Sequence, residues 1–305
     1  MRRRDLITAL PALPALSALA AGAAPAQPAG AARPLLRRIP SSGEEIPAIG
    51  LGSWITFNVG NDPPARARCA EVMRQFFAAG GRLIDSSPMY GSSQGVIGEG
   101  LQRAGAGAPV FAADKVWTSS NGAAQIETSR RLWRVPRFDL LQVHNLLAWE
   151  EQLALLQRMK AQGRVRYVGI TTSEGRRHRE VEQIMRSQRI DFVQFTYNIL
   201  DREVERRLLP LAQDRGIAVL ANRPFREGDL LRQLQRHPLP PWAREIGAAT
   251  WAQLALKFIV SHPAVTCAIP ATSRVDHVQE NMAAASGPLP DAALRRRMAA
   301  HAEQL

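Results

Sequence analysis

Four polar residues stand at or just after the ends of short apolar segments in this chain of 305 residues. Asp85 ends an apolar run in RLIDSSPMYGSS, and Tyr90 follows it five residues later. Lys115 ends VFAADK, and His144 ends FDLLQVH. A free tyrosine, with a pKa of about 10, is a weak acid at neutral pH, but a nearby ammonium lowers that pKa by stabilising the phenolate. Brought together, these four side chains would protonate an oxygen atom as a hydride arrives at its carbon.

Each of the four residues also has a purely structural interpretation. Asp85 would cap a turn, Tyr90 would pack in a loop, and His144 would be a hydrogen-bonded core histidine. Lys115 is harder to explain in this way, because an isolated buried ammonium is unfavourable unless it is paired. We expect Asp85 to be its partner, and we expect Asp114 to point to the opposite face of the same strand.

The segments that carry these residues belong to a regular alternation of short apolar runs and amphipathic runs. The apolar runs are continuous, which is typical of parallel strands buried on both faces. Strands are predicted over residues 48–54, 82–85, 109–115, 138–144, 164–171, 191–197, 217–223 and 264–270. Helices are predicted over residues 65–80, 94–104, 122–134, 149–163, 181–187, 202–216, 250–263, 275–285 and 290–305.

This alternation predicts an α/β fold with a parallel sheet. A doubly wound sheet would usually carry a glycine-rich turn after its first strand, but Gly50 and Gly52 lack the third glycine and WITFNVG follows them instead of a helix. Eight units in ~250 residues favour a closed (β/α)8 TIM barrel, whose chemistry lies where the strands end. LLRRIPSSGEEIPAIG predicts an N-terminal β-hairpin cap, and the last segment predicts a C-terminal helix. The barrel domain is predicted over residues 38–305.

The composition excludes several classes of function. Hydrophobic residues make up 46% of the chain and charged residues 22%, as in globular proteins. The net charge of +12 is spread along the chain without interleaved aromatic residues, so we expect no nucleic-acid partner. Cys69 and Cys267 lack metal-ligand spacing, and we expect two core cysteines and no metal site. No later segment has ~18 consecutive apolar residues, so we expect no stable membrane insertion. The sequence leaves the oligomeric state open between a monomer and a small homo-oligomer.

The N-terminal segment predicts targeting rather than a folded element. It has a basic start, a stretch rich in alanine and leucine, and then small residues. RRDLI, residues 3–7, resembles a twin-arginine export signal, which makes the export machinery an expected partner and the periplasm the expected location. We predict a signal peptide over residues 1–26 and a linker over 27–37. The candidate cleavage motifs are residues 24–26, 21–23 and 29–31. An organellar transit peptide or a disordered tail is the alternative.

Six motifs in order give this sequence a resemblance to the aldo-keto reductase family: LIDSSPMYG, ADKVW, LLQVHN, GRVRYVGIT, FVQFTYN and AIPATSRVDHVQEN. The resemblance covers nearly the whole chain after residue 38 and includes the hairpin. It implies a TIM barrel that binds a nicotinamide cofactor without a Rossmann fold. It also implies a catalytic tetrad in which Tyr90 is the proton donor: Asp85, Tyr90, Lys115 and His144.

The resemblance also implies which residues hold the nicotinamide end of the cofactor. Thr171 and Thr172 stand where the family has a serine and an asparagine for the carboxamide, and Gln194 matches the family's glutamine. Asn222 stands in place of the aromatic residue that stacks on the nicotinamide. Arg223 would contact the pyrophosphate.

The remaining cofactor candidates surround the adenine end: Phe225, Thr272, Ser273, Arg274, Glu280 and Asn281. Ala271 replaces the lysine that is common in NADP-dependent members. Arg274, near the start of a predicted helix, nevertheless suits a 2′-phosphate, although a solvated arginine is the alternative. We therefore expect NADP, with NAD as the alternative.

The expected substrate pocket has four residues: Trp54, Met89, Trp117 and Asn145. The two tryptophans are equally compatible with packing at the rim. The loop NLLAWEE and the C-terminal tail are short, which predicts an open site that accepts varied aldehydes or ketones. The leading hypothesis is an exported NADPH-dependent carbonyl reductase. One alternative is a cofactor-binding regulatory or interaction module with little turnover, and a weaker one is a hydrolase, which no paired carboxylates at strand ends support.

Overall fold

A computed structural model describes residues 34–105 and 107–305 of the chain. The predicted signal peptide and most of the predicted linker therefore lie outside the described residues. Strand β1 (Leu36–Arg38) pairs antiparallel with β2 (Glu45–Pro47), which confirms the hairpin and places its first residues within the segment predicted as linker. None of the helices in the described part of the chain is long and apolar enough to cross a membrane.

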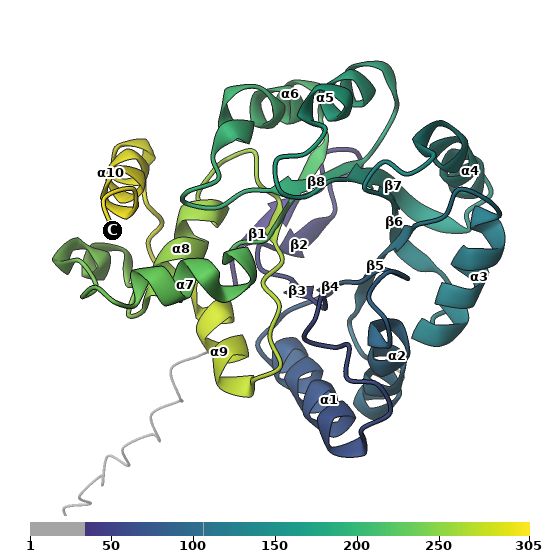
Figure 1. The fold of residues 1–305 in the computed structure, drawn as a ribbon, viewed down its shortest axis with the longest axis horizontal. Helices are drawn as coiled ribbons and strands as arrows, with labels where there is room; N and C mark the ends of the chain where they lie inside the picture. The colour runs from purple at the N-terminus through teal and green to yellow at the C-terminus, as the bar shows by residue number, and fades with distance from the viewer. Residues whose placement is uncertain (1–33, 106) are drawn as a thin grey trace, which may run out of the picture. The chain divides into compact units, whose positions relative to one another are not determined.

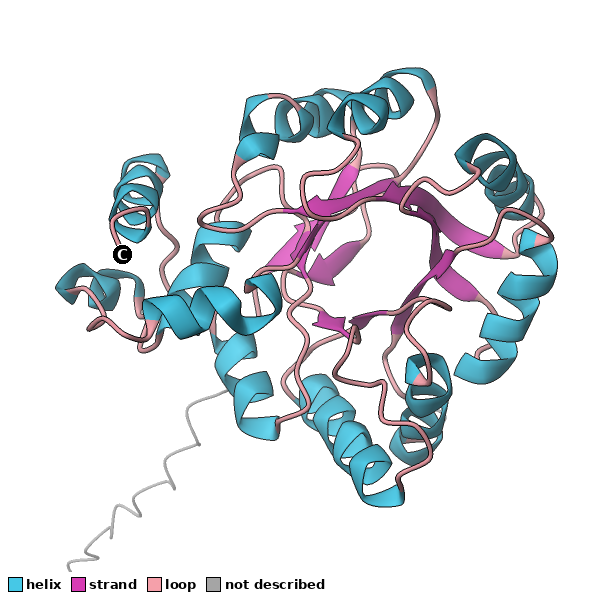
Figure 2. Ribbon diagram, viewed as in Figure 1, coloured by secondary structure: helices cyan, strands magenta, loops and turns pink. Residues whose placement is uncertain are grey.

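One sheet of eight parallel strands forms the centre of the described residues (Figures 1 and 2). Its strands are β3 (Leu51–Gly52), β4 (Leu83–Asp85), β5 (Phe111–Val116), β6 (Phe138–His144), β7 (Val165–Thr171), β8 (Phe192–Thr196), β9 (Ala218–Asn222) and β10 (Cys267–Ala268). Each strand pairs with the next one along the chain. Parallel bridges from Ile49 to Ala268 and from Gly52 to Ala271 join the first strand to the last and close the barrel, as predicted.

Helices surround this sheet in the view of Figure 1. They are α1 (Pro63–Ala78), α2 (Ser93–Ala104), α3 (Gly122–Trp133), α4 (Trp149–Ala161), α5 (His178–Ser187), α6 (Leu208–Arg215), α7 (Asp229–Leu234), α8 (Trp251–Val260), α9 (Val275–Ala283) and α10 (Ala292–Ala302). Short 3-10 helices are η1 (Glu203–Arg206), η2 (Arg226–Gly228) and η3 (Pro241–Ile246). The helix predicted over 202–216 is therefore η1 followed by α6. Arg207 separates them because its backbone, with φ −138° and ψ −48°, is not helical.

The hairpin seals the amino-terminal end of the barrel. Ile39 and Ile46 are fully buried in a cluster with the first inward-facing residues of the strands, among them Leu83 and Phe111. The hydroxyl of Tyr167 on β7 fixes the hairpin from inside by bonding to the Ser42 hydroxyl at 2.7 Å. The opposite end, where the strands finish, is left to form a site.

Candidate active site

The two-residue period of the strands brings polar side chains to the carboxyl end of the barrel. Leu83 and Phe111 face the interior, so Asp85 and Lys115, two and four residues later, face it as well. Asp114 points outward, as predicted, and its carboxylate accepts a hydrogen bond at 2.7 Å from Gln94 on α2. The same alternation places His144, Thr171 and Asn222 at the ends of β6, β7 and β9, and Gln194 two residues before the end of β8.

Lys115 and Asp85 form a buried ion pair. The ammonium donates to Asp85 Oδ2 at 2.6 Å and to the main-chain oxygen of Ser86 at 2.8 Å. Lys115 is 0% exposed and Asp85 2%. Burial lowers the pKa of Lys115, but the negative charge of Asp85 beside it outweighs burial, and the pKa is raised overall. The lysine is therefore held charged inside the barrel, with Asp85 as the partner that the sequence predicted.

Tyr90 lies beside this pair at the base of a cavity. The ammonium is 5.1 Å from the centre of its ring, and the rings of Trp54 and His144 lie at 4.9 and 5.6 Å. Burial raises the pKa of Tyr90 and Lys115 lowers it, with the net effect upward. The expected net lowering is thus wrong for this structure, because Asp85 compensates the ammonium and the ring is desolvated. Tyr90 consequently keeps its proton and is an acid rather than a phenolate.

His144 is held by a residue that the sequence analysis missed. Its Nδ1 lies 2.7 Å from the hydroxyl of Ser87. Burial, with the nearby Lys115 ammonium adding to it, lowers the pKa of His144 to about 2. The imidazole is therefore neutral. The position of Ser87, two residues after Asp85 at the end of β4, is the one sequence signal that would have suggested it.

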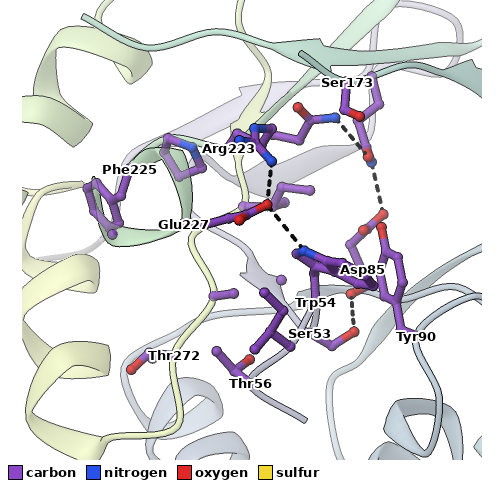
Figure 3. Close-up of a pocket in the computed structure, with 18 of the residues that line it drawn as sticks. Ser53, Trp54, Thr56, Asp85, Tyr90, Ser173, Arg223, Phe225, Glu227 and Thr272 are labelled. Carbon is purple, nitrogen blue, oxygen red and sulfur yellow. Dashed lines mark hydrogen bonds and ion pairs between the residues drawn. The ribbon is translucent and has the colours of Figure 1, made fainter. Parts of the chain in front are cut away.

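A cavity of about 490 Å³ opens above these residues (Figure 3). Fourteen of the predicted site residues line it: Trp54, Asp85, Met89, Tyr90, His144, Asn145, Thr171, Gln194, Asn222, Arg223, Phe225, Thr272, Glu280 and Asn281. The structure thus gathers most of the predicted tetrad, cofactor and substrate residues around one space.

Five of the predicted residues do not line the cavity: Lys115, Trp117, Thr172, Ser273 and Arg274. Of these, Lys115 lies next to a lining residue, with its ammonium 5.1 Å from the ring of Tyr90. Trp117 does not line the cavity. This side chain is 40% exposed, and its backbone is held by Gln125 at 2.7 and 2.9 Å. Thr172 is buried behind the wall, and its main-chain oxygen accepts from Asn222 at 2.9 Å. Ser273 also lies outside the lining.

Arg274 is not among the residues that line the cavity, and it pairs with Asp276. Its Nε donates to an Asp276 oxygen at 3.0 Å, and both side chains are largely exposed. Arg274 occupies the N-cap position of α9, as the helix prediction implied. To reach a ligand phosphate, it has to exchange this carboxylate for the phosphate.

A chain of charged residues that sequence reasoning missed crosses the rim of the cavity. Arg223 contacts Glu227 and, at 3.2 Å, Glu174, while Glu227 accepts from Trp54 Nε1 at 3.4 Å (Figure 3). Arg176 and His277 also line the space. The spacing of four residues between Arg223 and Glu227 was the available signal, but the loop is not a regular helix and such a pair could not be read from periodicity.

One wall of the cavity carries a hydrogen-bonded set of hydroxyl and amide groups. Thr171 Oγ1 donates to Gln194 Oε1 at 3.1 Å, and Gln194 Nε2 donates to Asp85 at 2.9 Å. Asn222 Nδ2 lies 3.4 Å from Gln194 Oε1. Groups that both donate and accept suit a carboxamide, which does the same. The residues present therefore fit the nicotinamide end of the expected cofactor.

Within residues 34–105 and 107–305, no three side chains of the metal-binding types are grouped so as to hold an ion. Cys69 and Cys267 are both buried and free. Burial raises the pKa of the Cys69 thiol to about 11, and that of Cys267 is raised too. Both cysteines are therefore unreactive thiols packed in the core.

The sequence profile of the Aldo/keto reductase family matches residues 48–300. The chain belongs to the aldo/keto reductase family. This aldo/keto reductase is 29% identical over 257 residues to the methylglyoxal reductase YeaE of Escherichia coli, with 81% of this chain and 88% of that protein covered. It is 25% identical over 249 residues to the NADH-specific methylglyoxal reductase of the same organism, covering 68% and 73%. An aldo/keto reductase of Klebsiella pneumoniae, solved with NADP and acetate, superimposes with a TM-score of 0.70 at 23% identity, covering 84% and 91%.

Proposed function

We propose that this protein is an NADPH-dependent reductase that converts aldehydes or ketones to alcohols. The observation that carries the proposal is the buried ammonium of Lys115, which lies 2.6 Å from Asp85 and 5.1 Å from the ring of Tyr90. A charge of this kind has no structural need, because an apolar side chain would fill the same space at lower desolvation cost. Beside a protonated phenol at the base of a cavity, it has a chemical use.

Each catalytic side chain has one task in this reaction. When bound, a nicotinamide cofactor would supply the hydride that adds to the carbonyl carbon. Tyr90 gives its hydroxyl proton to the carbonyl oxygen, and Lys115 stabilises the phenolate that remains. Asp85 holds Lys115 in place, and His144 lies beside the same oxygen. The phenolate regains a proton from solvent after the alcohol leaves.

The residues that would hold the cofactor divide into two groups. Thr171, Gln194 and Asn222 would hold the carboxamide, and Arg223 would face the pyrophosphate. Thr272, Arg274 and Asn281 would hold the adenosine end near the start of α9. The relatives differ in cofactor, one being NADH-specific and another solved with NADP. Our choice of NADPH therefore depends on Arg274, a cation at the start of α9 that could meet a 2′-phosphate.

The test is reduction of a panel of aldehydes and ketones. Methylglyoxal is included because the two Escherichia coli relatives are both named as methylglyoxal reductases. Oxidation of NADPH is followed at its nicotinamide absorbance band. Tyr90→Phe should lower kcat by a factor on the order of 10² to 10⁴, the usual range for loss of a general acid. Tyr167→Phe is the matched control, because it removes a tyrosine hydroxyl from the opposite end of the barrel. Cofactor binding without turnover across the panel would refute the reductase and favour the regulatory module.

We also propose that the protein is exported by the twin-arginine route to the periplasm. The support is the RRDLI motif within residues 1–33, which lie outside the described residues. Changing Arg3 and Arg4 together to lysine should retain the protein in the cytoplasmic fraction of a bacterial host. Equal periplasmic amounts of the two forms would contradict this route.

A further inference from the structure

The loop between β4 and α2 controls the proton position on His144. We infer that Ser87 is a positioning residue whose hydroxyl holds His144 as the tautomer with its proton on Nε2. That nitrogen is then the donor with which His144 would orient the substrate carbonyl in the proposed mechanism. The last step rests on the proposed reductase function, whereas the tautomer itself does not.

The hydrogen bonds of Ser87 fix the direction of its hydroxyl. Ser87 is 0% exposed, so its partners are protein groups. Its Oγ accepts from the main-chain N–H of Met89 at 3.2 Å, and a backbone N–H is always a donor. The hydroxyl hydrogen has one acceptor in the described residues, His144 Nδ1 at 2.7 Å. Ser87 therefore donates to Nδ1, and Nδ1 carries no proton.

The rest of the imidazole follows from its surroundings. The ring is buried and lies near the Lys115 ammonium, and both conditions oppose a second proton. The single proton is consequently on Nε2. The two ring nitrogens point in nearly opposite directions, so Nε2 points away from Ser87. His144 lines the cavity and meets the ring of Tyr90 edge-on, at an angle of 83°.

This arrangement divides the work on the carbonyl oxygen. Tyr90 has one proton to transfer, and a second donor beside it polarises the carbonyl and orients it. A neutral imidazole with Nε2–H can donate without transferring its proton. The opposite tautomer would present a lone pair to the substrate oxygen and repel it. Ser87 thus acts on the reaction through His144 and does not touch the substrate.

The first experiment is nitrogen-15 NMR of the full domain labelled at histidine, without substrate. The chain has six histidines, and the resonances of His144 are those lost in His144→Asn. We expect the protonated nitrogen to be Nε2, identified by its couplings to both carbon-bound ring protons. A protonated Nδ1 in the wild type overturns the inference, whether or not the enzyme is active. An inactive protein that retains Nε2–H would overturn only the proposed function.

The second experiment compares two serine variants. Ser87→Ala should give a mixture of the two His144 tautomers and lower kcat/KM for the carbonyl substrate about tenfold, with the Kd for NADPH unchanged. Ser86→Ala is the matched control: its hydroxyl is equally buried but makes no hydrogen bond, so the His144 spectrum should stay that of the wild type. A pure Nε2–H spectrum with unchanged kcat/KM in Ser87→Ala would overturn the positioning role. If Ser87→Ala fails to fold, the wild-type spectrum alone decides.

Discussion

Replacing Asp85 by asparagine tests the energetics of the buried ion pair. The change keeps the size of the side chain but removes the charge that lies 2.6 Å from the Lys115 ammonium. Lys115 then keeps only neutral acceptors, the main-chain oxygen of Ser86 and the amide oxygen of the new side chain. Breaking a buried pair by removing one partner typically destabilises a protein by about 3–5 kcal/mol, because the remaining charge is uncompensated. We expect Asp85→Asn to lower the free energy of unfolding by about that amount at neutral pH.

The loss should shrink as the pH rises. In the wild type the pKa of Lys115 is raised, so its contribution to stability is present at neutral pH and is lost as the pH passes the folded-state value. In Asp85→Asn, burial is no longer opposed by Asp85, and the pKa should fall below the unfolded value of about 10.4. The unfolded variant then binds more protons, and its stability increases with pH. The two proteins should therefore converge between about pH 7 and pH 10, by at most about 1.36 kcal/mol for each pH unit.

Urea unfolding followed by tryptophan fluorescence at several pH values measures this effect. Asp191→Asn is the control, because Asp191 pairs with Lys160 at the same kind of distance, 2.7 Å. Lys160 is 41% exposed at its side chain, so water solvates its charge when the partner is removed. We expect a smaller loss that does not vary over this pH range. If Asp85→Asn costs no more than Asp191→Asn, or its loss is independent of pH, the argument from burial is wrong.

Two further predictions concern Asp114 and Arg274. Burial raises the pKa of Asp114 to about 7, so the folded state binds a proton at pH values where the unfolded state has already released it. Wild-type stability should therefore fall by about 2 kcal/mol as the pH rises from about 5 to about 7. Asp114→Asn should remove that slope in the urea midpoints, and a flat wild-type profile would contradict it. Arg274→Ala should raise the Kd for NADPH about tenfold and leave NADH nearly unchanged, the size of one charge-assisted contact. Asp276→Ala should instead lower the Kd for NADPH, because it frees Arg274. If Arg274→Ala changes the Kd of NADPH and NADH equally in a fluorescence titration, this role of Arg274 is refuted.

The order of the strands, and of every α-helix except α7, followed from the sequence because each of these elements carries its own period. The predicted strand over 138–144 is β6 without change, and the predicted helix over 122–134 differs from α3 by one residue. The strands that close the barrel were predicted too long. The segments 48–54 and 264–270 contribute only β3 and β10, of two residues each. A segment is apolar because it is buried, but the length of a strand depends on how many of its residues pair with the neighbouring strand. For β3 and β10 that pairing joins the two ends of the chain's sheet, and a local sequence pattern does not show it.

The same division holds for the site. The tetrad could be predicted because Asp85, Lys115 and His144 end strands whose alternation fixes their direction. Trp117 could not be placed, because it follows the last residue of β5 and the alternation no longer applies to it. The contacts of Ser87 with His144 and of Arg223 with Glu174 join residues far apart in the chain. Their side chains meet only after folding, so a local sequence pattern does not predict these contacts.

Closure of the barrel has a consequence for when the protein can become complete. The bridge between Ile49 and Ala268 joins residues about 220 positions apart, and pairings of such long range form late in folding. Until β10 emerges from the ribosome, β3 and β9 are open edges that invite pairing with other chains. A chain exported after folding would therefore need its last strand before it is fit to leave. Truncation before Cys267, which removes β10, should leave an aggregating chain rather than a smaller active one.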